Sequence, residues 1–553
     1  MVEGGDMIDA LADRLLDLIG TEDPLRASMT GIPGHDHELR DFSPEADSDL
    51  RDRAVRIAAE AELAEPGVTR SVVLHLAASL VDRVNAGLVD HVLASFISAP
   101  TIQLVTFAPR VVPTSEQAES AYLERLSAIP RYLAQIADRN RAAVAAERFP
   151  VARMARTAIT HIDRYLSHTP DAFTQPSLTS GAAAQRDRLL AEAARPAFVQ
   201  YREVLDKEIA PHGRSDDKPG LCWLPDGDAA YDAMVRVHTT TARTPEELHR
   251  TGLQLIEALA EEYATIGSRV FGLSTAAEVQ ERLRTDPSLK WGSAEEILTH
   301  ARTTIERAEH VAPQWFTRLP DKRCAVEPVP DAEAPNVAAA YYTDPALDGS
   351  REGTYWINTY KATDRDRTIA EAIAFHEAVP GHHFQTASAQ QIDNLPLLRR
   401  LAFITAYSEG WALYAERLAD EMGLYSDDLA RLGMVAEDSM RAARLVVDTG
   451  LHAMGWSRQQ TVDYLRDNTV MSDVEIQAEV DRYIEYPGQA LSYMVGRMEI
   501  QRVRAKAVET MGSAFDIKGF HDVVLGGGPL PMAVLDEVVA DWVLTRAGLS
   551  PGM

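Results

Sequence analysis

Hydrophobic side chains recur every three to four residues along most of the chain, which is the spacing of helices that bury one face. In the first part of the chain this pattern predicts helices over residues 7–19, 47–65, 70–88, 115–145, 152–167 and 182–209. A connector rich in proline, glycine and polar residues follows at 211–220. No motif that carries chemistry precedes this connector, so we interpret residues 1–215 as a helical scaffold lobe.

Residues 216–553 continue in the same helical pattern and form the second predicted lobe. Thr244 is followed by Pro245 and, three residues after the threonine, by Glu247, which combines a helix N-cap, a proline in the first turn and a capping box. The same spacing recurs in three further pairs: Ser293 with Glu296, Ser457 with Gln460, and Ser472 with Glu475. The sequence therefore predicts a mainly α fold, a large helical body of two lobes.

Two segments have the composition and alternation of β-strands instead, 337–343 and 354–359, and a loop that contains Asp348 and Gly349 separates them. Strands isolated in a helical protein usually pair into a small sheet, whose edge can bind an extended peptide by adding a strand. Tyr341 lies in the first segment, and we expect it to contact such a peptide. The alternative is a structural hairpin that only packs on a helix.

The chain has 553 residues, of which 46% are hydrophobic and 25% charged, the proportions of an ordinary globular protein. Its net charge of −28 argues against nucleic acids and anionic membranes as partners. With two cysteines, Cys222 and Cys324, neither a disulfide framework nor a cysteine-based zinc site is expected. The acidic N-terminus is unlike a signal peptide, and prolines interrupt the apolar stretch 91–113. We therefore expect a cytoplasmic protein without a membrane span.

Candidate chemistry is concentrated in residues 375–385, which read Phe-His-Glu-Ala-Val-Pro-Gly-His-His-Phe-Gln. Two imidazoles can hold a zinc ion, and a glutamate beside the first can deprotonate a zinc-bound water, as in the H-E-x-x-H motif of zinc peptidases. Here His376 and Glu377 supply the first half of such a motif, and His382 supplies the second imidazole.

His376 and His382 are 382 − 376 = 6 residues apart rather than four, so on an unbroken helix they would be about 120° out of line. Pro380 and Gly381 lie between them, and these residue types favour a bulge or a break in the helix. The alternative is a helix that simply ends at the Pro-Gly pair, with a coincidental cluster among the 16 histidines of the chain.

A zinc site of this kind takes a third protein ligand, commonly a carboxylate. Residues 397–418 are apolar on almost every side, which predicts a buried helix, and Glu409 lies in it. A buried carboxylate is costly unless it is paired or bound to a metal, so we predict Glu409 as the third ligand, with a structural salt bridge as the alternative. Glu416, on the same face, either orients a ligand histidine or lies at the surface.

Four segments together resemble one known family, the bacterial domain-of-unknown-function 885 proteins. They are His-Glu-Ala-Val-Pro-Gly-His-His at 376–383, Ser-Glu-Gly-Trp-Ala-Leu-Tyr-Ala-Glu at 408–416, Arg-Leu-Val-Val-Asp-Thr-Gly-Leu-His at 444–452 and Pro-Gly-Gln-Ala-Leu-Ser-Tyr-Met-Val-Gly at 487–496. The resemblance extends along the chain from residue 23 and includes 231–252.

This resemblance implies a two-lobed, metallopeptidase-like helical fold with a central cleft and a small sheet beside the metal site. The implied fold is similar to that of the group that contains carboxypeptidase Taq, thimet oligopeptidase and angiotensin-converting enzyme. Members of that group carry the shorter motif, and a Gly-His pair at the second ligand favours His382 over His383.

A polar stripe runs along the predicted helix 429–456 at spacings of three and four residues, and it consists of Glu437, Arg441, Arg444, Asp448 and His452. If the stripe lines a cleft, Asp448 could orient His452, and His452 could hydrogen-bond an oxyanion. The alternative is a solvated helix face.

A second stripe follows Pro487 and Gly488, where Gln489, Tyr493 and Arg497 recur every four residues. We predict Tyr493 as a donor to the oxyanion, and Gln489 and Arg497 as contacts to the substrate. The alternative for the tyrosine is a place in the core.

Taken together, these features predict a zinc-dependent peptidase with a peptide as its substrate. The predicted ligands of Zn²⁺ are His376, His382 and Glu409. Glu377 takes a proton from the zinc-bound water and passes it to the leaving nitrogen, while Tyr493 or His452 stabilises the oxyanion. Two other classes stay open: a non-haem iron enzyme with two histidines and one carboxylate, and a catalytically inactive peptide-binding protein of the same fold.

Overall fold

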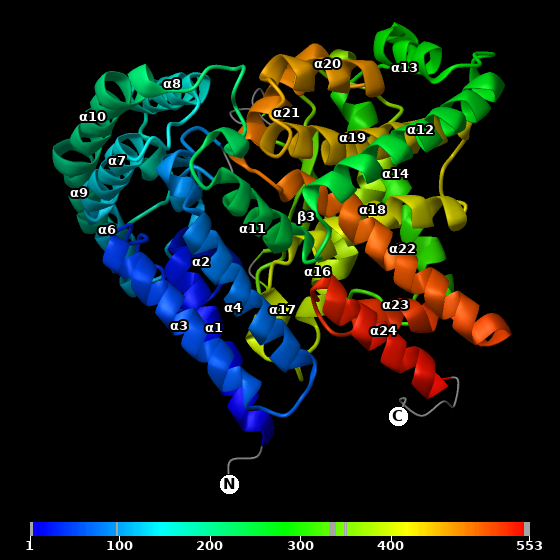
Figure 1. The fold of residues 1–553 in the computed structure, drawn as a ribbon, viewed down its shortest axis with the longest axis horizontal. Coiled ribbons are helices and arrows are strands. Elements are labelled where there is room, and N and C mark those ends of the chain that lie inside the picture. The colour runs from blue at the N-terminus through cyan, green and yellow to red at the C-terminus, as the bar shows by residue number, and fades with distance from the viewer. Residues whose placement is uncertain are drawn as a thin grey trace. The chain divides into compact units, whose positions relative to one another are not determined.

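In the computed structural model the chain is mainly helical with one small sheet, which confirms the predicted class of fold (Figure 1). The structure describes residues 4–95, 98–330, 334, 339–347, 349 and 351–546. The chain divides into two compact units. The first consists of Met1–Val237, Gly450–Val462 and Gln477–Pro487, and the second of His238–Thr449, Asp463–Ile476 and Gly488–Met553. The first unit therefore extends beyond the expected boundary at residue 215 and includes two later segments.

The first unit contains α1 (Gly4–Glu22), α2 (Pro24–Thr30), α3 (Pro44–Glu62), α4 (Val68–Ala86), α5 (Pro100–Phe107), α6 (Glu116–Ser127), α7 (Ile129–Ala145), α8 (Ala152–Ser167), α9 (Ser180–Leu189), α10 (Arg195–Val204) and most of α11 (Gly227–Thr239). Helices α1, α3 and α4 pack side by side (Figure 1). The single helix predicted over 115–145 is two helices, α6 and α7, because Pro130 in the first turn of α7 cannot continue the hydrogen-bond ladder of α6.

The connector at 211–220 lies within the first unit instead of marking its end. The N–H of Arg214 donates to the carbonyl of Pro150 at 2.8 Å, and the N–H of Ala152 donates to the carbonyl of Arg214 at 2.9 Å. Arg153 also forms an ion pair with Asp216 at 2.8 Å. Proline and glycine correctly predicted an irregular segment, but backbone pairing holds this segment to the helical body.

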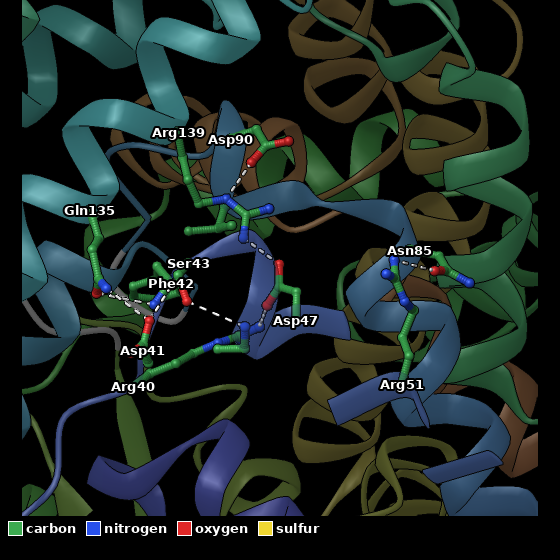
Figure 2. Close-up of polar contacts among 12 residues, drawn as sticks. Arg40, Asp41, Phe42, Ser43, Asp47, Arg51, Asn85, Asp90, Gln135 and Arg139 are labelled. Carbon is green, nitrogen blue, oxygen red and sulfur yellow. Dashed lines mark hydrogen bonds and ion pairs between the residues drawn. The ribbon is translucent and has the colours of Figure 1, made fainter. Parts of the chain in front are cut away.

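A group of partly buried ion pairs ties the helices of the first unit together (Figure 2). Asp47 of α3 pairs with Arg40 at 3.1 Å and with Arg139 of α7. Arg139 also donates to Asp90 at 2.7 Å, and Asp90 accepts from Arg148 at 2.8 Å. Every carboxylate in this group meets at least two guanidinium groups, which is how buried charges are tolerated.

One stretch of the first unit, Val68–Asp90, is long and apolar enough to cross a membrane by length and composition alone, and half of its most apolar window is buried inside the protein. Its helix, α4, packs against α1 and α3, and Arg83 pairs with the buried Glu22. These are the contacts of a core helix, for which the same length and composition are ordinary.

The second unit contains α12 (Pro245–Val270), α13 (Ala276–Thr285), α14 (Ala294–Val311), α15 (Ala370–Glu377), α16 (His382–Gln390), α17 (Leu397–Leu401), α18 (Thr405–Glu421), α22 (Ser492–Met511), α23 (Ile517–Leu525) and α24 (Met532–Arg546). Three further helices contribute residues to both units: α19 (Asp428–His452), α20 (Arg458–Asn468) and α21 (Asp473–Glu485).

The capping box of Thr244 and Glu247 is present at the start of α12 as predicted. The helix predicted over 397–418 is interrupted, because Ala402 is extended and α18 begins only at Thr405.

Helices α18 and α22 of the second unit cross in close contact (Figure 1). A Cβ on Gly410 of α18 would lie 2.4 Å from the Cα of Gly496 on α22, and a Cβ on Gly496 would lie 1.8 Å from the carbonyl oxygen of Ala406. Backbone meets backbone there, so neither glycine can be replaced without separating the helices. The crossing fixes Glu409 of α18 relative to Tyr493 of α22.

The sheet has three strands, β1 (Ala325–Pro328), β2 (Ala340–Thr343) and β3 (Thr354–Ile357), in the order β1-β3-β2. Strand β3 is parallel to β1 and antiparallel to β2. The two predicted strands correspond to β2 and β3, whereas β1 was not predicted because its four residues alternate too briefly to be recognised. Val337, Ala338 and Asp348 of the predicted hairpin lie outside the described residues. The sheet packs against α14 and α15 and so adjoins the helix that carries His376.

Candidate metal centre

The two motif histidines lie on either side of a helix break, as the Pro-Gly pair predicts. His376 is in the last turn of α15, and His382 is the first residue of α16. A Cβ on Gly381 would lie 1.9 Å from the carbonyl oxygen of His376, so only glycine fits this tight passage of the chain. The indole N–H of Trp411 on α18 donates to the carbonyl of Pro380 at 2.8 Å and fixes the turn between the two histidines.

His376, His382 and Glu409 converge, with one potential ligand atom from each lying within 4.8 Å of the other two. Nε2 of His376 lies 3.6 Å from Oε2 of Glu409, and Nε2 of His382 lies 3.3 Å from the same oxygen. Two donors that share one tetrahedral zinc ion at about 2.0–2.2 Å are separated by roughly 3.3–3.6 Å. The spacing of these three side chains therefore fits a single metal ion.

Glu416 orients the first histidine. Nδ1 of His376 donates to Oε1 of Glu416 at 2.7 Å, and both side chains are buried. Burial alone would lower the pKa of His376, but the carboxylates of Glu409 and Glu416 raise it to about 10. Burial likewise would raise the pKa of Glu409, but the two imidazoles lower it. Of the two alternatives left open for Glu416, the structure selects the buried partner of a histidine and rules out the surface position.

Glu377 lies at the end of α15 and is half-buried. Within the described part of the chain, its carboxylate makes no hydrogen bond. Burial raises the pKa values of Cys324, Tyr342 and Tyr355, and the negative charge of Glu377 adds to all three shifts. The carboxylate of Glu377 therefore lies toward the sheet and directly follows a candidate ligand.

His383 follows His382 but lies away from the cluster. Its Nδ1 accepts from the hydroxyl of Tyr342 at 3.0 Å, and its Nε2 donates to the carbonyl of Lys322 at 2.9 Å. Both ring nitrogens of His383 are engaged in these hydrogen bonds, the lone pair of Nδ1 by Tyr342, which agrees with the choice of His382 as the ligand.

The structure places Tyr342 of β2, and not the predicted peptide contact Tyr341, beside the motif histidines. Tyr341 lies against Trp356, with ring centroids 6.2 Å apart. Tyr342 lies against His382 at 6.4 Å and against His383 at 5.7 Å. Successive side chains of a strand point to opposite faces, so the two tyrosines have different neighbours, and the role predicted for Tyr341 stays a prediction.

Tyr493 is close to the cluster, as predicted. Its ring lies nearly parallel to that of His376, with centroids 6.4 Å apart, and the amide of Gln489 donates to its hydroxyl at 3.4 Å. The guanidinium groups of Arg444 and Arg441 lie over the same ring, 4.6 Å and 5.9 Å from its centre. The sequence shows these two arginines only as members of a helical stripe, because residue spacing does not reveal a contact with another helix.

Arg497 is not placed to bind a substrate. Its side chain is buried and forms an ion pair with Asp438, which also pairs with Arg417 of α18. The repeat of four residues correctly puts Arg497 on the same side of α22 as Tyr493, but Arg497 lies one turn further along the helix, beside Asp438. The position of Arg497 is that of a structural ion pair in the second unit.

His452 is not an oxyanion donor either. It belongs to the first unit, is buried, and has a pKa lowered to about 4 by burial. Its Nδ1 accepts from the N–H of Leu221 at 3.1 Å, and its Nε2 donates to the carbonyl of Tyr483 at 2.9 Å. Asp448, expected to orient it, accepts from the N–H of Gly488 at 3.0 Å. The stripe is thus a buried structural face and not a solvated one.

The fold and the cluster define a class of protein. It is mainly helical, and three of its helices bring two histidines and a glutamate together. A family model described as "Bacterial protein of unknown function (DUF885)" matches residues 24–539. The chain belongs to this family. No curated protein matches the chain.

Two solved structures have the same fold. A "putative lipoprotein" from Colwellia psychrerythraea shares 26% identity and superposes with a TM-score of 0.91, over 99% of this chain and 100% of that chain. A "putative lipoprotein of unknown function" from Shewanella oneidensis shares 17% identity with a TM-score of 0.75, over 96% and 99%. The likeness to the Colwellia structure contradicts the expected cytoplasmic location, because a lipoprotein is anchored at a membrane outside the cytoplasm. That expectation was wrong.

Proposed function

We propose that this protein is a zinc-dependent peptidase with a metallopeptidase-like fold. The observation that carries the proposal is the convergence of His376, His382 and Glu409 next to a carboxylate, Glu377, that makes no hydrogen bond within the described residues. A metal-binding cluster alone would fit many roles. A base that directly follows a ligand histidine is the arrangement that hydrolysis of an amide requires.

The donor set fits zinc. Two imidazole nitrogens and one carboxylate are the ligands of catalytic zinc sites, which leave the fourth position for water or substrate. Hydrogen bonding to Glu416 fixes the tautomer of His376 and leaves its Nε2 for the metal. A zinc ion bound there would supply a Lewis acid that polarises a carbonyl and lowers the pKa of a water molecule.

The side chains around the cluster divide the remaining work. Glu377 takes the proton of the attacking water and returns it to the leaving nitrogen, so that the C–N bond breaks with a neutral amine as the product. Tyr493 donates its hydroxyl hydrogen to the oxygen that gains negative charge. Two arginines over the face of its ring, Arg444 and Arg441, hold it in place beside His376.

A location outside the cytoplasm is part of the same proposal, and the likeness to the Colwellia lipoprotein supports it. The peptides that such an enzyme meets would then be extracellular or periplasmic. Fractionation of cells that express the natural gene, followed by immunoblotting, tests this point.

Metal analysis of the purified protein, combined with a peptide-hydrolysis assay, tests the activity. We expect one zinc per chain, hydrolysis of unstructured peptides, and loss of both after treatment with a chelator. Iron at the site would indicate a non-haem iron enzyme, and no metal would indicate a peptide-binding protein without activity.

A further inference from the structure

The two candidate histidine ligands are held in different ways. Nδ1 of His376 donates to the buried carboxylate of Glu416. For His382, no hydrogen bond to Nδ1 is found among the described residues, and its polar contact is Nε2 with Glu409 at 3.3 Å. A metal-bound histidine usually has its second nitrogen held by a hydrogen bond, which orients the ring. Among the described residues, ring packing is therefore what orients His382.

The packing partner is Tyr342 of β2. Its ring lies nearly parallel to that of His382, at 19° and with centroids 6.4 Å apart. On another side His382 meets the ring of His376 edge-on, at 90° and 4.8 Å. The orientation of His382 thus depends on where the Tyr342 ring is held.

His383 holds that ring, and the direction of each hydrogen bond is fixed. Nε2 of His383 lies 2.9 Å from the carbonyl oxygen of Lys322. A carbonyl only accepts, so Nε2 carries the hydrogen and Nδ1 has the lone pair. The hydroxyl of Tyr342, 3.0 Å from Nδ1, must then donate to it. The phenol is oriented by a histidine that is buried and is itself fixed to the backbone.

The surrounding chain makes room for this contact. A Cβ on Gly353, the residue before β3, would lie 2.3 Å from the hydroxyl of Tyr342 and 2.7 Å from Nδ1 of His383. Gly353 does not have a positive φ, so space and not backbone conformation requires glycine here. Any side chain at position 353 would push the two partners apart.

We propose that Tyr342 and His383 are positioning residues that set the orientation of His382 and thereby the affinity of the metal centre. This inference rests on the proposed zinc function. Neither residue contacts the reacting atoms. They hold the ring of His382 in one orientation before the metal binds, and this lowers the conformational entropy that is lost on binding.

The first test is Tyr342→Phe, which keeps the ring and removes the hydroxyl. We expect the dissociation constant for zinc, measured by competition with a chromophoric chelator, to rise about tenfold, the lower end of the effect of removing a partner of a ligand. The chain offers a matched control in Tyr414, whose hydroxyl lies 3.0 Å from Nε2 of His521, while Nδ1 of His521 donates to the carbonyl of Trp315 at 2.9 Å. Tyr414→Phe breaks the same kind of buried chain away from the ligands, so it should lower thermal stability and leave zinc affinity unchanged.

Two variants of His383 separate its two hydrogen bonds. In His383→Asn the amide oxygen takes the place of Nδ1 and can still accept from Tyr342, so zinc affinity should stay within about threefold of wild type. In His383→Gln the amide nitrogen takes the place of Nε2 and can still donate to Lys322, but the acceptor for Tyr342 is lost. That variant should show the same tenfold loss as Tyr342→Phe.

The outcomes distinguish the inference from the function on which it rests. If Tyr342→Phe and His383→Gln melt earlier, as Tyr414→Phe does, but bind zinc as wild type does, the pair is an ordinary core contact and the inference is wrong. A wild-type protein without stoichiometric zinc binding overturns the proposed function and the inference together. If the wild type binds zinc but hydrolyses no peptide, the peptidase proposal fails, while the affinities of the variants still decide the role of Tyr342 and His383.

Discussion

The Nδ1 atom of His376 lies 2.7 Å from Oε1 of Glu416, in a fully buried contact between α15 and α18. It leaves Nε2 of His376 facing Glu409 at 3.6 Å. Removing such a partner of a ligand histidine typically weakens metal binding 10–100-fold. We expect Glu416→Gln to raise the zinc dissociation constant by at least about tenfold, because a neutral amide is a weaker acceptor for the ring N–H. A competition titration measures the change.

Glu421 provides the control for that variant. It lies on the same helix, is partly exposed and pairs with Arg504 at 2.7 Å. Glu421→Gln should leave zinc affinity unchanged. Equal affinities for Glu416→Gln and wild type would show that Glu416 does not act on the metal through His376.

Glu377→Gln is expected to keep zinc and lose hydrolysis. The amide has nearly the same shape as the carboxylate but lacks the basicity to take a proton from water. The carboxylate of Glu377 makes no hydrogen bond within the described residues, so the substitution breaks none there. Metal analysis and the turnover number of the same preparation provide the measurement. Substantial activity in a zinc-loaded variant would exclude Glu377 as the base.

Local sequence was sufficient to predict that His376, His382 and Glu409 lie together, because each member of the cluster has a local signature. The Pro-Gly pair between His376 and His382 predicts the helix break, and the break is what allows two histidines six residues apart to converge. Glu409 was recognisable as a charge in an apolar helix. These arguments depend only on neighbouring residues, and the structure agrees with them.

Contacts between distant segments could not be predicted in the same way. Whether Tyr341 or Tyr342 faces the histidines depends on the register of a four-residue strand. Arg497 and Tyr493 lie on one side of α22, yet the position of the Arg497 side chain is set by its ion pair with Asp438 of α19. The place of His452 depends on Leu221 and Tyr483, each far away in sequence. A helical stripe shows which residues share a face and not what that face meets.

Arg497→Met tests the structural role of Arg497. Loss of one partner from a buried ion pair typically costs 3–5 kcal/mol, and since Asp438 keeps Arg417, we expect about 3 kcal/mol of lost stability. Urea unfolding measures it, and the Michaelis constant for a peptide should hardly change. A raised Michaelis constant with normal stability would restore the substrate-binding role predicted from the sequence.

Acid should destabilise the protein through buried neutral histidines. Burial lowers the pKa of His452 and of His521 to about 4, against an ordinary value of about 6.5 in the unfolded chain. As the pH falls, the unfolded state therefore takes up these protons first. The stability that neutral burial provides is fully present above pH 6.5 and is lost progressively between about 6.5 and 4, by up to roughly 3 kcal/mol for each histidine.

The measurement is urea unfolding at several pH values across this window. His452→Gln cannot titrate, so its free energy of unfolding should depend less steeply on pH than that of wild type. An identical slope in both proteins would mean that His452 is protonated in the folded state or does not become exposed on unfolding.

Tyr493→Phe is expected to lower turnover strongly while the protein stays folded. The ring stays between His376 and Arg444, so packing is conserved and only the hydroxyl is lost. Removing one donor to an oxyanion typically lowers turnover about 100–1,000-fold, and if the donor acts only in the transition state the Michaelis constant changes little. Steady-state kinetics and thermal melting of the zinc-loaded variant measure both effects.

Since both nitrogens of His452 are occupied in the core of the first unit, no substitution of His452 should reproduce this kinetic pattern in a folded protein. Normal turnover with a lower melting temperature would show instead that the phenol is a structural hydrogen bond and that the oxyanion is stabilised without it.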